Sequence, residues 1–394
     1  MSYMNLFYFM NWLTENYGID PEATALVNSR ELYFIPAVNP DGLVYNQQIA
    51  SNGGGMQRKN RRETCSGGFY GADGIDLNRN YSYMWGYDNS GSSPDGCSET
   101  YRGTSPFSES ETETVKNFVE AHDFKIALNY HSYGNLFIHP YGYDPSLSLP
   151  EEDHEIFIEY GEAMTQYNNY LLGTGIETVG YTVNGEACDW MYGEHGIYAY
   201  TPEVGADSDG FWPSTIRIVP LAEENLFPNQ FAAWAVGAKY EVDFAVAAGP
   251  YSPGETYSTN LSIFNSGLGD SNGSLNLSID SPDDYLYFET ESVEIGNLSS
   301  RTGVDLGDIL TFQVLSSAPS GVMTELTIHV TDEDNYDHVT TIELIIGQAV
   351  PVASYNFEET DGWTVGDVGD DATAGIWELA VPVATFFDGN QAQP

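Results

Sequence analysis

The pattern of apolar residues changes near residue 240, and this change constrains the fold more than any other feature of the chain. Before it, helical patterns alternate with short apolar runs, which is typical of an α/β domain. After it, runs rich in Tyr, Thr, Ser, Val and Ile lie between clusters of Gly, Asn, Asp and Pro, which predicts an all-β sandwich of the immunoglobulin-like type. We therefore predict three domains, over residues 1–240, 241–348 and 349–394, the last being the start of a truncated β domain of jelly-roll type.

Within residues 1–240, short apolar runs predict strands and periodic stretches predict helices. The predicted strands cover residues 31–38, 125–131, 136–139 and 197–203, and the predicted helices cover residues 3–17, 108–122, 151–172 and 221–240. In the first helix apolar side chains recur at steps of three and four, and Gly18 is placed to end it. Ser108 followed by Glu111 resembles a capping box at the start of the second helix.

The chain is strongly acidic, and its bases are unevenly placed. It holds 12 Lys and Arg against 58 Asp and Glu, for a formal charge of −46, which excludes nucleic-acid binding on electrostatic grounds. Arg301 is the single base after residue 240. Such an acidic, Lys-poor surface indicates an extracellular or saline environment. It either is solvated without a ligand or binds divalent cations. A hydrophobic fraction of 41% predicts a folded chain, and no apolar run approaches the roughly 18 residues of a membrane helix.

Five of the twelve bases lie within 22 residues, which indicates that they hold an anion. These bases are Arg58, Lys59, Arg61, Arg62 and Arg79. Ion pairing with the abundant carboxylates is the alternative. The run Asp76-Leu77-Asn78-Arg79-Asn80 suits bidentate recognition of a carboxylate, because a planar guanidinium offers two parallel donors.

His131 and Glu203 each follow an apolar run, and strand ends are where α/β sheets place their sites. A neutral imidazole ligates zinc, and a carboxylate takes a proton from a metal-bound water. Taken alone, each residue has an ordinary alternative, because a single His is often hydrogen-bonded structure and a single Glu is often a surface group.

Motifs spread over the first 240 residues carry a resemblance to a known family. In sequence order they are Asn39-Pro40-Asp41-Gly42, Arg58-Lys59-Asn60-Arg61, Asp76-Leu77-Asn78-Arg79-Asn80, Cys97-Ser98-Glu99-Thr100-Tyr101-Arg102-Gly103, His131-Ser132-Tyr133, Pro140-Tyr141-Gly142-Tyr143, Tyr181, Asp189-Trp190 and Glu203. From Met1 to about Tyr240 the chain resembles the zinc metallocarboxypeptidases of the carboxypeptidase A/B type. The resemblance implies a mixed central sheet flanked by helices, and zinc-dependent hydrolysis of the C-terminal bond of peptides and proteins.

The resemblance also implies a role for each matching residue. His131 is expected to be a zinc ligand, Glu203 the general base, and Arg58 the substrate-binding group that stabilises the oxyanion. The groups expected to hold the free C-terminal carboxylate are Asn78, Arg79 and Tyr181. For the tyrosine, the alternative is an ordinary packed aromatic side chain.

The resemblance implies a mostly apolar pocket for the terminal side chain. Its expected lining is Ile138, Gly142, Val183, Cys188 and Thr201, with Glu186 nearby. An apolar pocket favours aromatic or aliphatic chain ends, whereas Glu186 would accept Lys or Arg unless it points to solvent. The resemblance further implies a disulfide between Cys65 and Cys97 with Cys188 left free, and such a bridge stabilises a fold by roughly 3 to 4 kcal/mol in the chain-entropy model.

One part of the family pattern is missing. These enzymes bind zinc through two His and one Glu, the first two within His-x-x-Glu, and that motif does not occur in this sequence. We expect those ligands just upstream of Met1, so that the chain is a fragment cut at both ends that by itself binds zinc poorly and hydrolyses nothing. The prediction is a secreted zinc metallocarboxypeptidase whose β domains act as spacers or bind calcium or glycan. The alternative is a non-catalytic module that binds peptide C-termini.

Overall fold

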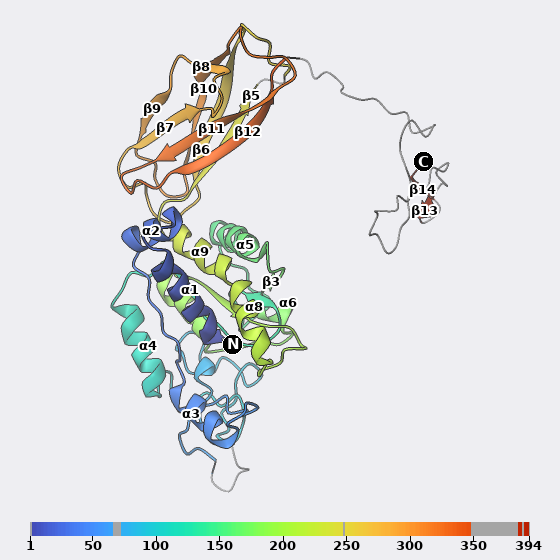
Figure 1. Ribbon diagram of the computed structural model, residues 1–394. Helices are drawn as coiled ribbons and strands as arrows, with labels where there is room; N and C mark the ends of the chain where they lie inside the picture. Colours follow the sequence, from blue (N-terminus) through green and yellow to red (C-terminus); the bar gives the residue numbers. More distant parts are fainter. Residues whose placement is uncertain (1, 66–71, 247–248, 348–384, 388–389, 394) are drawn as a thin grey trace.

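The computed structural model describes residues 2–65, 72–246, 249–347, 385–387 and 390–393. Figure 1 shows an α/β region in the lower half and a β-sandwich above it, with helix α2 at the junction. None of the described helices is long and apolar enough to cross a membrane. Most of the predicted third domain lies outside the described residues, which include there the paired strands β13 (Thr385–Phe387) and β14 (Asn390–Gln393).

The central sheet of the α/β region has the strand order β1-β4-β2-β3. Its strands are β1 (Ile126–Leu128), β4 (Tyr198–Glu203), β2 (Leu136–Ile138) and β3 (Leu171–Gly173). β1 runs parallel to β4 and β2 runs parallel to β3, whereas β2 and β4 are antiparallel, so the sheet is mixed, as predicted. Because successive residues of a strand point to opposite faces, Ala199 and Tyr200 of β4 enter different apolar clusters.

The helices of the α/β region are mostly short. In chain order they are α1 (Ser2–Asn16), α2 (Pro21–Ser29), α3 (Pro40–Ile49), η1 (Leu77–Arg79), α4 (Ser110–Glu120), α5 (Glu151–Thr165), α6 (Gly175–Thr178), α7 (Ala187–His195), η2 (Thr215–Arg217), α8 (Ile218–Glu223) and α9 (Leu226–Ala235). Side chains of α5 and α9 join the apolar cluster around Phe157, and those of α4 and α7 join the cluster around Trp190. Gly196 ends α7 with a φ of 66°, which turns the chain directly into β4.

Residues 31–38 form no strand, although the sequence predicts one. No described segment pairs with them, and a strand without a neighbour has no ladder to join. These residues and β1 line a cavity of about 740 Å³ that extends to Arg58 and His131. The rings of Tyr33 and Phe118, 5.4 Å apart, also belong to its wall.

Three predicted helical features differ from the structure. The helix predicted over residues 151–172 ends at the close of α5, because Asn169 takes a left-handed conformation with φ 55° and the next residues join the sheet as β3. The helix predicted over residues 221–240 is divided by a turn into α8 and α9. The capping box predicted at Ser108 is absent, since Glu109 directly precedes α4 and its side chain makes no capping bond.

The β-sandwich consists of two antiparallel four-stranded sheets that share one core, as the alternating pattern predicts. One sheet holds β5 (Tyr240–Val246), β6 (Thr256–Asn265), β10 (Gly303–Val314) and β8 (Leu286–Phe288), and the other holds β12 (His338–Ile345), β11 (Met323–Thr331), β7 (Leu275–Asp280) and β9 (Ser292–Gly296). Leu261, Leu310 and Leu326 are fully buried between them. The apolar residues of the alternating pattern therefore form the buried core between the two sheets.

Ion pairs join the sandwich to the α/β region. Nη2 of Arg301 lies 2.6 Å from Oε2 of Glu159 on α5, and its Nη1 donates to the carbonyl oxygen of Ser266 at 2.7 Å. In the opposite sense, Nη1 of Arg30, which follows α2, lies 3.6 Å from Oδ2 of Asp334 in the sandwich. Each region thus supplies one arginine and one carboxylate to the junction.

Candidate active site

The ends of two central strands bring His131 and Glu203 together. The two residues form a parallel β-bridge at the last residue of β4. Nδ1 of His131 lies 3.7 Å from Oε1 of Glu203, and the two side chains are 28% and 15% exposed. Oε2 of Glu203 is buried and has no hydrogen-bond partner in the described part of the chain. Oε2 of Glu203 is therefore a hydrogen-bond acceptor without a donor, in a site that is largely shielded from solvent.

Burial shifts the pKa of both groups. It lowers the pKa of His131 to about 4, and the charge of Arg58 acts in the same direction, so the imidazole is neutral at pH 7. Burial raises the pKa of Glu203 to about 8 against the opposing charge of Arg58, so this carboxyl group holds a proton at neutral pH. A neutral imidazole is the form that binds a metal, and a carboxyl group that titrates near neutrality is matched to proton transfer.

Arg58 and Arg79 converge on the carboxylate of Asp76. Nε and Nη2 of Arg58 each lie 2.9 Å from Oδ2 of Asp76, and Nη1 of Arg79 lies 3.9 Å from the same oxygen. Burial alone would raise the pKa of Asp76, but the two guanidinium groups lower it below its usual value. One negative charge therefore faces two positive ones, in a chain with a formal charge of −46.

The short turn η1 carries two of the predicted carboxylate-binding residues. Nε of Arg79 donates to the carbonyl of Gly91 at 2.9 Å and Nη1 donates to the carbonyl of Asn78 at 2.7 Å, whereas Nη2 has no hydrogen bond to any described residue. Oδ1 of Asn78 accepts the N–H of Ala187 at 3.0 Å, which ties η1 to the start of α7. Tyr181 is 54% exposed, so it is not the packed aromatic side chain of the alternative interpretation.

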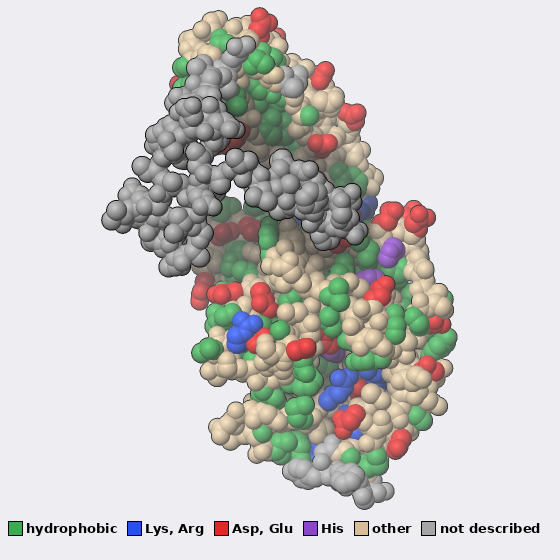
Figure 2. Space-filling model, turned by 90° about the vertical axis from the view of Figure 1, so that its right-hand side faces the viewer, with side chains coloured by type: hydrophobic (Ala, Val, Ile, Leu, Met, Phe, Trp, Pro, Cys, Tyr) green, Lys and Arg blue, Asp and Glu red, His purple; other side chains and the backbone are tan. Residues whose placement is uncertain are grey.

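The other three bases of the predicted cluster are used within the protein. Nζ of Lys59 is buried and donates to two backbone carbonyls. The guanidinium of Arg61 lies 3.7 Å from the centroid of an aromatic ring, and Arg62 pairs with Glu109 at 3.2 Å. The alternative of internal pairing therefore holds for these three bases, and Arg58 and Arg79 remain the candidates for holding an anion. On the face seen in Figure 2, the blue side chains gather mainly on the lower, α/β part.

The structure brings the predicted pocket residues together. They are Ile138, Gly142, Val183, Cys188 and Thr201, and all are buried. Ile138 and Thr201 face each other across β2 and β4, and the carbonyl of Gly142 accepts the N–H of Val183 at 2.9 Å. Glu186 is 7% exposed, so the alternative in which it points to solvent is wrong.

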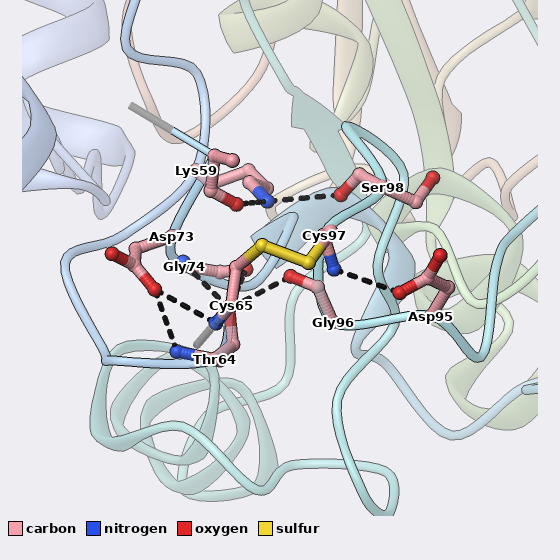
Figure 3. The surroundings of a disulfide bond; sticks show 10 residues. Lys59, Thr64, Cys65, Asp73, Gly74, Asp95, Gly96, Cys97 and Ser98 are labelled. Atoms are coloured by element: carbon pink, nitrogen blue, oxygen red, sulfur yellow. Dashed lines mark hydrogen bonds between the residues drawn. A yellow bond between two sulfur atoms is a disulfide. The ribbon is translucent and has the colours of Figure 1, made fainter. Parts of the chain in front are cut away.

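Cys65 and Cys97 form the predicted disulfide, with Cα atoms 4.8 Å apart, and Cys188 is free and buried. Figure 3 shows Asp73 beside the bridge, where its Oδ1 accepts the backbone N–H groups of Thr64 and Cys65 at 2.9 and 2.8 Å. These bonds and the disulfide hold the loop that carries the basic residues against the loop around Cys97.

Comparison of the sequence with known proteins identifies the family of this chain. The family model named zinc carboxypeptidase matches residues 1–227, which is more than half of the 394 residues. The chain belongs to the zinc carboxypeptidase family. The matched range includes His131, Glu203 and both arginines that face Asp76.

Individual proteins are similar to slightly more than half of the chain. It is 33% identical to carboxypeptidase A1 of Mus musculus over 225 residues, which are 55% of this chain and 51% of that protein. It is 36% identical to a metallocarboxypeptidase A-like protein of Trichophyton verrucosum over 215 residues, or 52% and 49% of the two chains. Bovine thrombin-activatable fibrinolysis inhibitor, solved in complex with tick carboxypeptidase inhibitor, is 29% identical with a TM-score of 0.48, covering 58% of this chain and 75% of that one. The chain spans about half the length of the curated relatives it matches.

A zinc carboxypeptidase needs a metal site, and the described residues supply part of one. His131 offers a neutral imidazole, and Glu203 offers a buried oxygen without a hydrogen-bond partner. A catalytic zinc takes about three protein ligands and a water. No group of three or more His, Cys, Asp or Glu that could hold a metal ion occurs among the residues whose structure is described. These residues alone therefore do not fit a complete zinc site.

Asp76 is the site residue to which sequence reasoning gave no role. It appeared in a motif with Asn78 and Arg79, but among 58 acidic residues a carboxylate that orients arginines looks like any other. A local signal was present, because Asp is a preferred residue just before a helical turn. Oδ1 of Asp76 does accept the N–H of Asn78, at 3.2 Å.

Proposed function

We propose that the chain binds the free C-terminus of peptides or proteins and forms the substrate-binding part of a secreted zinc metallocarboxypeptidase that hydrolyses the C-terminal peptide bond. The observation that carries this proposal is the convergence of Arg58 and Arg79 on the single carboxylate of Asp76. A substrate carboxylate would neutralise the surplus positive charge and would meet a donor, Nη2 of Arg79, that the described residues leave unused.

Each predicted residue has a place in this proposal. Arg79 and the amide N–H groups of Asn78 hold the terminal carboxylate, because Oδ1 of Asn78 is already occupied by the N–H of Ala187. Arg58 is close enough to His131 and Glu203 to shift the pKa of both, so it is suited to stabilise charge on the carbonyl oxygen of the terminal peptide bond. Glu203 is proposed as the general base, because a carboxyl group with a pKa of about 8 can take up and return a proton near neutral pH.

Two further expectations remain proposals. Secretion is supported by the disulfide between Cys65 and Cys97, since such bonds persist in oxidising compartments, and by the acidic, Lys-poor composition. The sandwich is proposed to be of the immunoglobulin-like type and to act as a spacer, with calcium or glycan binding as alternatives.

A second candidate function is a module that binds peptide C-termini without hydrolysing them. One observation favours it: no group of three or more metal-binding side chains occurs in the described ranges, whereas the arginine pair is in place.

Zinc titration separates the two functions. Submicromolar zinc binding that vanishes in His131→Ala, or chelator-sensitive release of single C-terminal residues, would favour catalysis by this chain. We expect neither from these 394 residues.

Peptide binding tests the carboxylate site itself. Fluorescence polarisation with labelled tripeptides should show at least about tenfold tighter binding of the free acid than of the amide, as expected for a charge-assisted bidentate contact. Arg79→Gln should remove this difference, and Lys116→Ala, which changes a partly exposed base on α4, should preserve it. Full preference for free acids in the Arg79 variant would show that the carboxylate is held elsewhere.

A further inference from the structure

The tripeptide Asn-x-Ser recurs in the sandwich, at residues 260–262, 272–274, 276–278 and 297–299. These sites take four of the six Asn between residues 241 and 347, whereas the 19 Asn of residues 1–240 give a single site, at residues 80–82. Exported proteins accept N-linked glycans on the Asn of this tripeptide, in which the middle residue is anything but Pro. The acceptor sequence is therefore concentrated in the sandwich.

In three of these sites the middle residue is a Leu of the sandwich core, namely Leu261, Leu277 and Leu298. Alternate residues of a strand point to opposite faces, so a buried Leu within β6 or β7 turns the Asn and the Ser beside it outward. The Asn residues of the three sites are exposed, and their side chains make no hydrogen bond to any described residue. They are Asn260, Asn276 and Asn297. Each therefore presents a free amide nitrogen to solvent.

The two sites within strands both lie at a β-bulge. In β10 the register shifts between Gly307 and Leu310, opposite Asn260 of β6. In the pairing of β7 with β9 the register shifts between Leu275 and Asn276. A bulge re-aims side chains and interrupts the ladder, and Asn is itself a poor strand former. Strand formation therefore does not explain why Asn occupies these two outward positions.

The Asn side chains of the other two sites are engaged within the protein. Nδ2 of Asn272 donates to Oδ1 of Asp334 at 2.7 Å. Asn80 is fully buried, and its Nδ2 donates to two backbone carbonyls and to Oγ of Ser108. A glycan is bulky and needs an amide nitrogen that is exposed and free, which neither residue offers. The structure thus separates three accessible acceptors from two engaged ones.

We propose that Asn260, Asn276 and Asn297 carry N-linked glycans in the exported protein. This inference rests on the proposed secretion and is independent of the peptide site. The donor is an oligosaccharide joined through a diphosphate to a polyprenyl lipid, which the export pathway supplies. Nδ2 forms a bond to C1 of the first sugar and loses a proton, while the bond between C1 and the diphosphate breaks and the lipid diphosphate leaves.

Glycans at these positions would cover the outer faces of both sheets. Asn260 lies on β6 and Asn276 on β7, and each of these strands is an inner strand of its own sheet. Figure 1 shows both strands above the α/β region that holds the candidate site. Covered faces leave little surface for docking, so the glycans suit a sandwich that acts as a spacer while the site stays open.

The test is expression of the full chain behind an export signal in a eukaryotic cell line, followed by peptide mass spectrometry. Peptide N-glycosidase F removes N-linked glycans and leaves Asp in place of Asn, so it marks each occupied site. We expect this conversion at Asn260, Asn276 and Asn297 and none at Asn80. Ser278→Ala should abolish the glycan on Asn276, whereas Ser278→Thr keeps an acceptor sequence and should preserve it.

An exported chain that is folded by circular dichroism but lacks glycans at the three Asn would overturn the inference and leave the proposed secretion standing. A modification of Asn276 that survives in Ser278→Ala, or a glycan on Asn80 in the folded chain, would also overturn it. Retention inside the cells without glycans would contradict secretion and glycosylation together. A chain with the expected glycans that binds no peptide acid would support the inference and contradict the proposed peptide site alone.

Discussion

The two regions of the molecule bury different kinds of polar side chain. The α/β region buries charged residues, namely Lys59, Asp76, Arg79, Glu109, Glu186, Asp189 and Asp209. In the sandwich, the buried polar residues of the described range are uncharged, namely Thr259, Asn265, Ser266, Ser271, Thr324 and Thr327. Buried charges are costly, and they are often retained where a ligand or a reaction uses them. The contrast supports the proposal that the α/β region binds the ligand, whereas the sandwich buries only uncharged polar groups in its described range.

Removing the charge of Asp76 should test this contrast most strongly. In Asp76→Asn two buried or partly buried guanidinium groups would face each other without their carboxylate, so the free energy of unfolding should fall by about 3 to 5 kcal/mol. Urea denaturation measures it. The matched change Glu294→Gln, on the exposed side of β9 in the sandwich, should alter that free energy by less than about 0.5 kcal/mol. Equal effects of the two substitutions would remove the distinction between the regions.

A cavity in the sandwich should affect stability but leave the ligand site unchanged. Leu326→Ala removes a fully buried side chain from the shared core and should lower the free energy of unfolding by about 3 kcal/mol. Peptide affinity, measured by fluorescence polarisation well below the unfolding midpoint, should stay within about twofold, because no sandwich residue takes part in the site as described. A large loss of affinity in a folded Leu326 variant would show that the sandwich shapes the site.

The same contrast explains what the sequence could predict. The sandwich follows from alternating polarity, which depends on neighbouring residues alone. In the α/β region, residues 31–38 have the apolar character of a strand but no described partner, and pairing depends on a segment that local pattern does not reveal. The end of α5 depends on the left-handed conformation of Asn169, which Asn tolerates but does not require.

In the site, too, some features follow from sequence motifs and others depend on the packing of the folded protein. The strand-end positions of His131 and Glu203 and the pairing of Cys65 with Cys97 were predicted, because motif order carries that information. The burial of Glu186 was left open, since the exposure of one Glu depends on the packing around it. The electrostatic environment of a side chain is set by the folded structure around it, so a local sequence pattern does not determine it.

The buried charge of Glu186 should make the stability of the α/β region depend on pH. Its pKa is raised from 4.5 to about 7 by burial, so its favourable contribution is complete below about pH 4.5 and is lost as the pH rises through 7. Glu186→Gln should remove this loss, which corresponds to about 2 to 3 kcal/mol between pH 4.5 and 8. Thermal unfolding of both proteins across this range measures the difference. A difference that is constant with pH would contradict the buried ionisation, and Glu155→Gln provides the matched control.

The smallest predicted effect lies at the junction of the two regions. Arg301 is the single base after residue 240, and its guanidinium makes two contacts with the carboxylate of Glu159, at 2.9 and 2.6 Å. Both side chains are partly exposed, so a double-mutant cycle with Arg301→Ala and Glu159→Gln should give a coupling energy of about 1 kcal/mol, decreasing with added salt. If this coupling joins the regions, scanning calorimetry should show one transition for the unaltered chain and a separation into two for the double variant. A coupling of zero with an unchanged single transition would mean that other junction contacts hold the regions together, and the pair Arg30 and Asp334 would be the next to test.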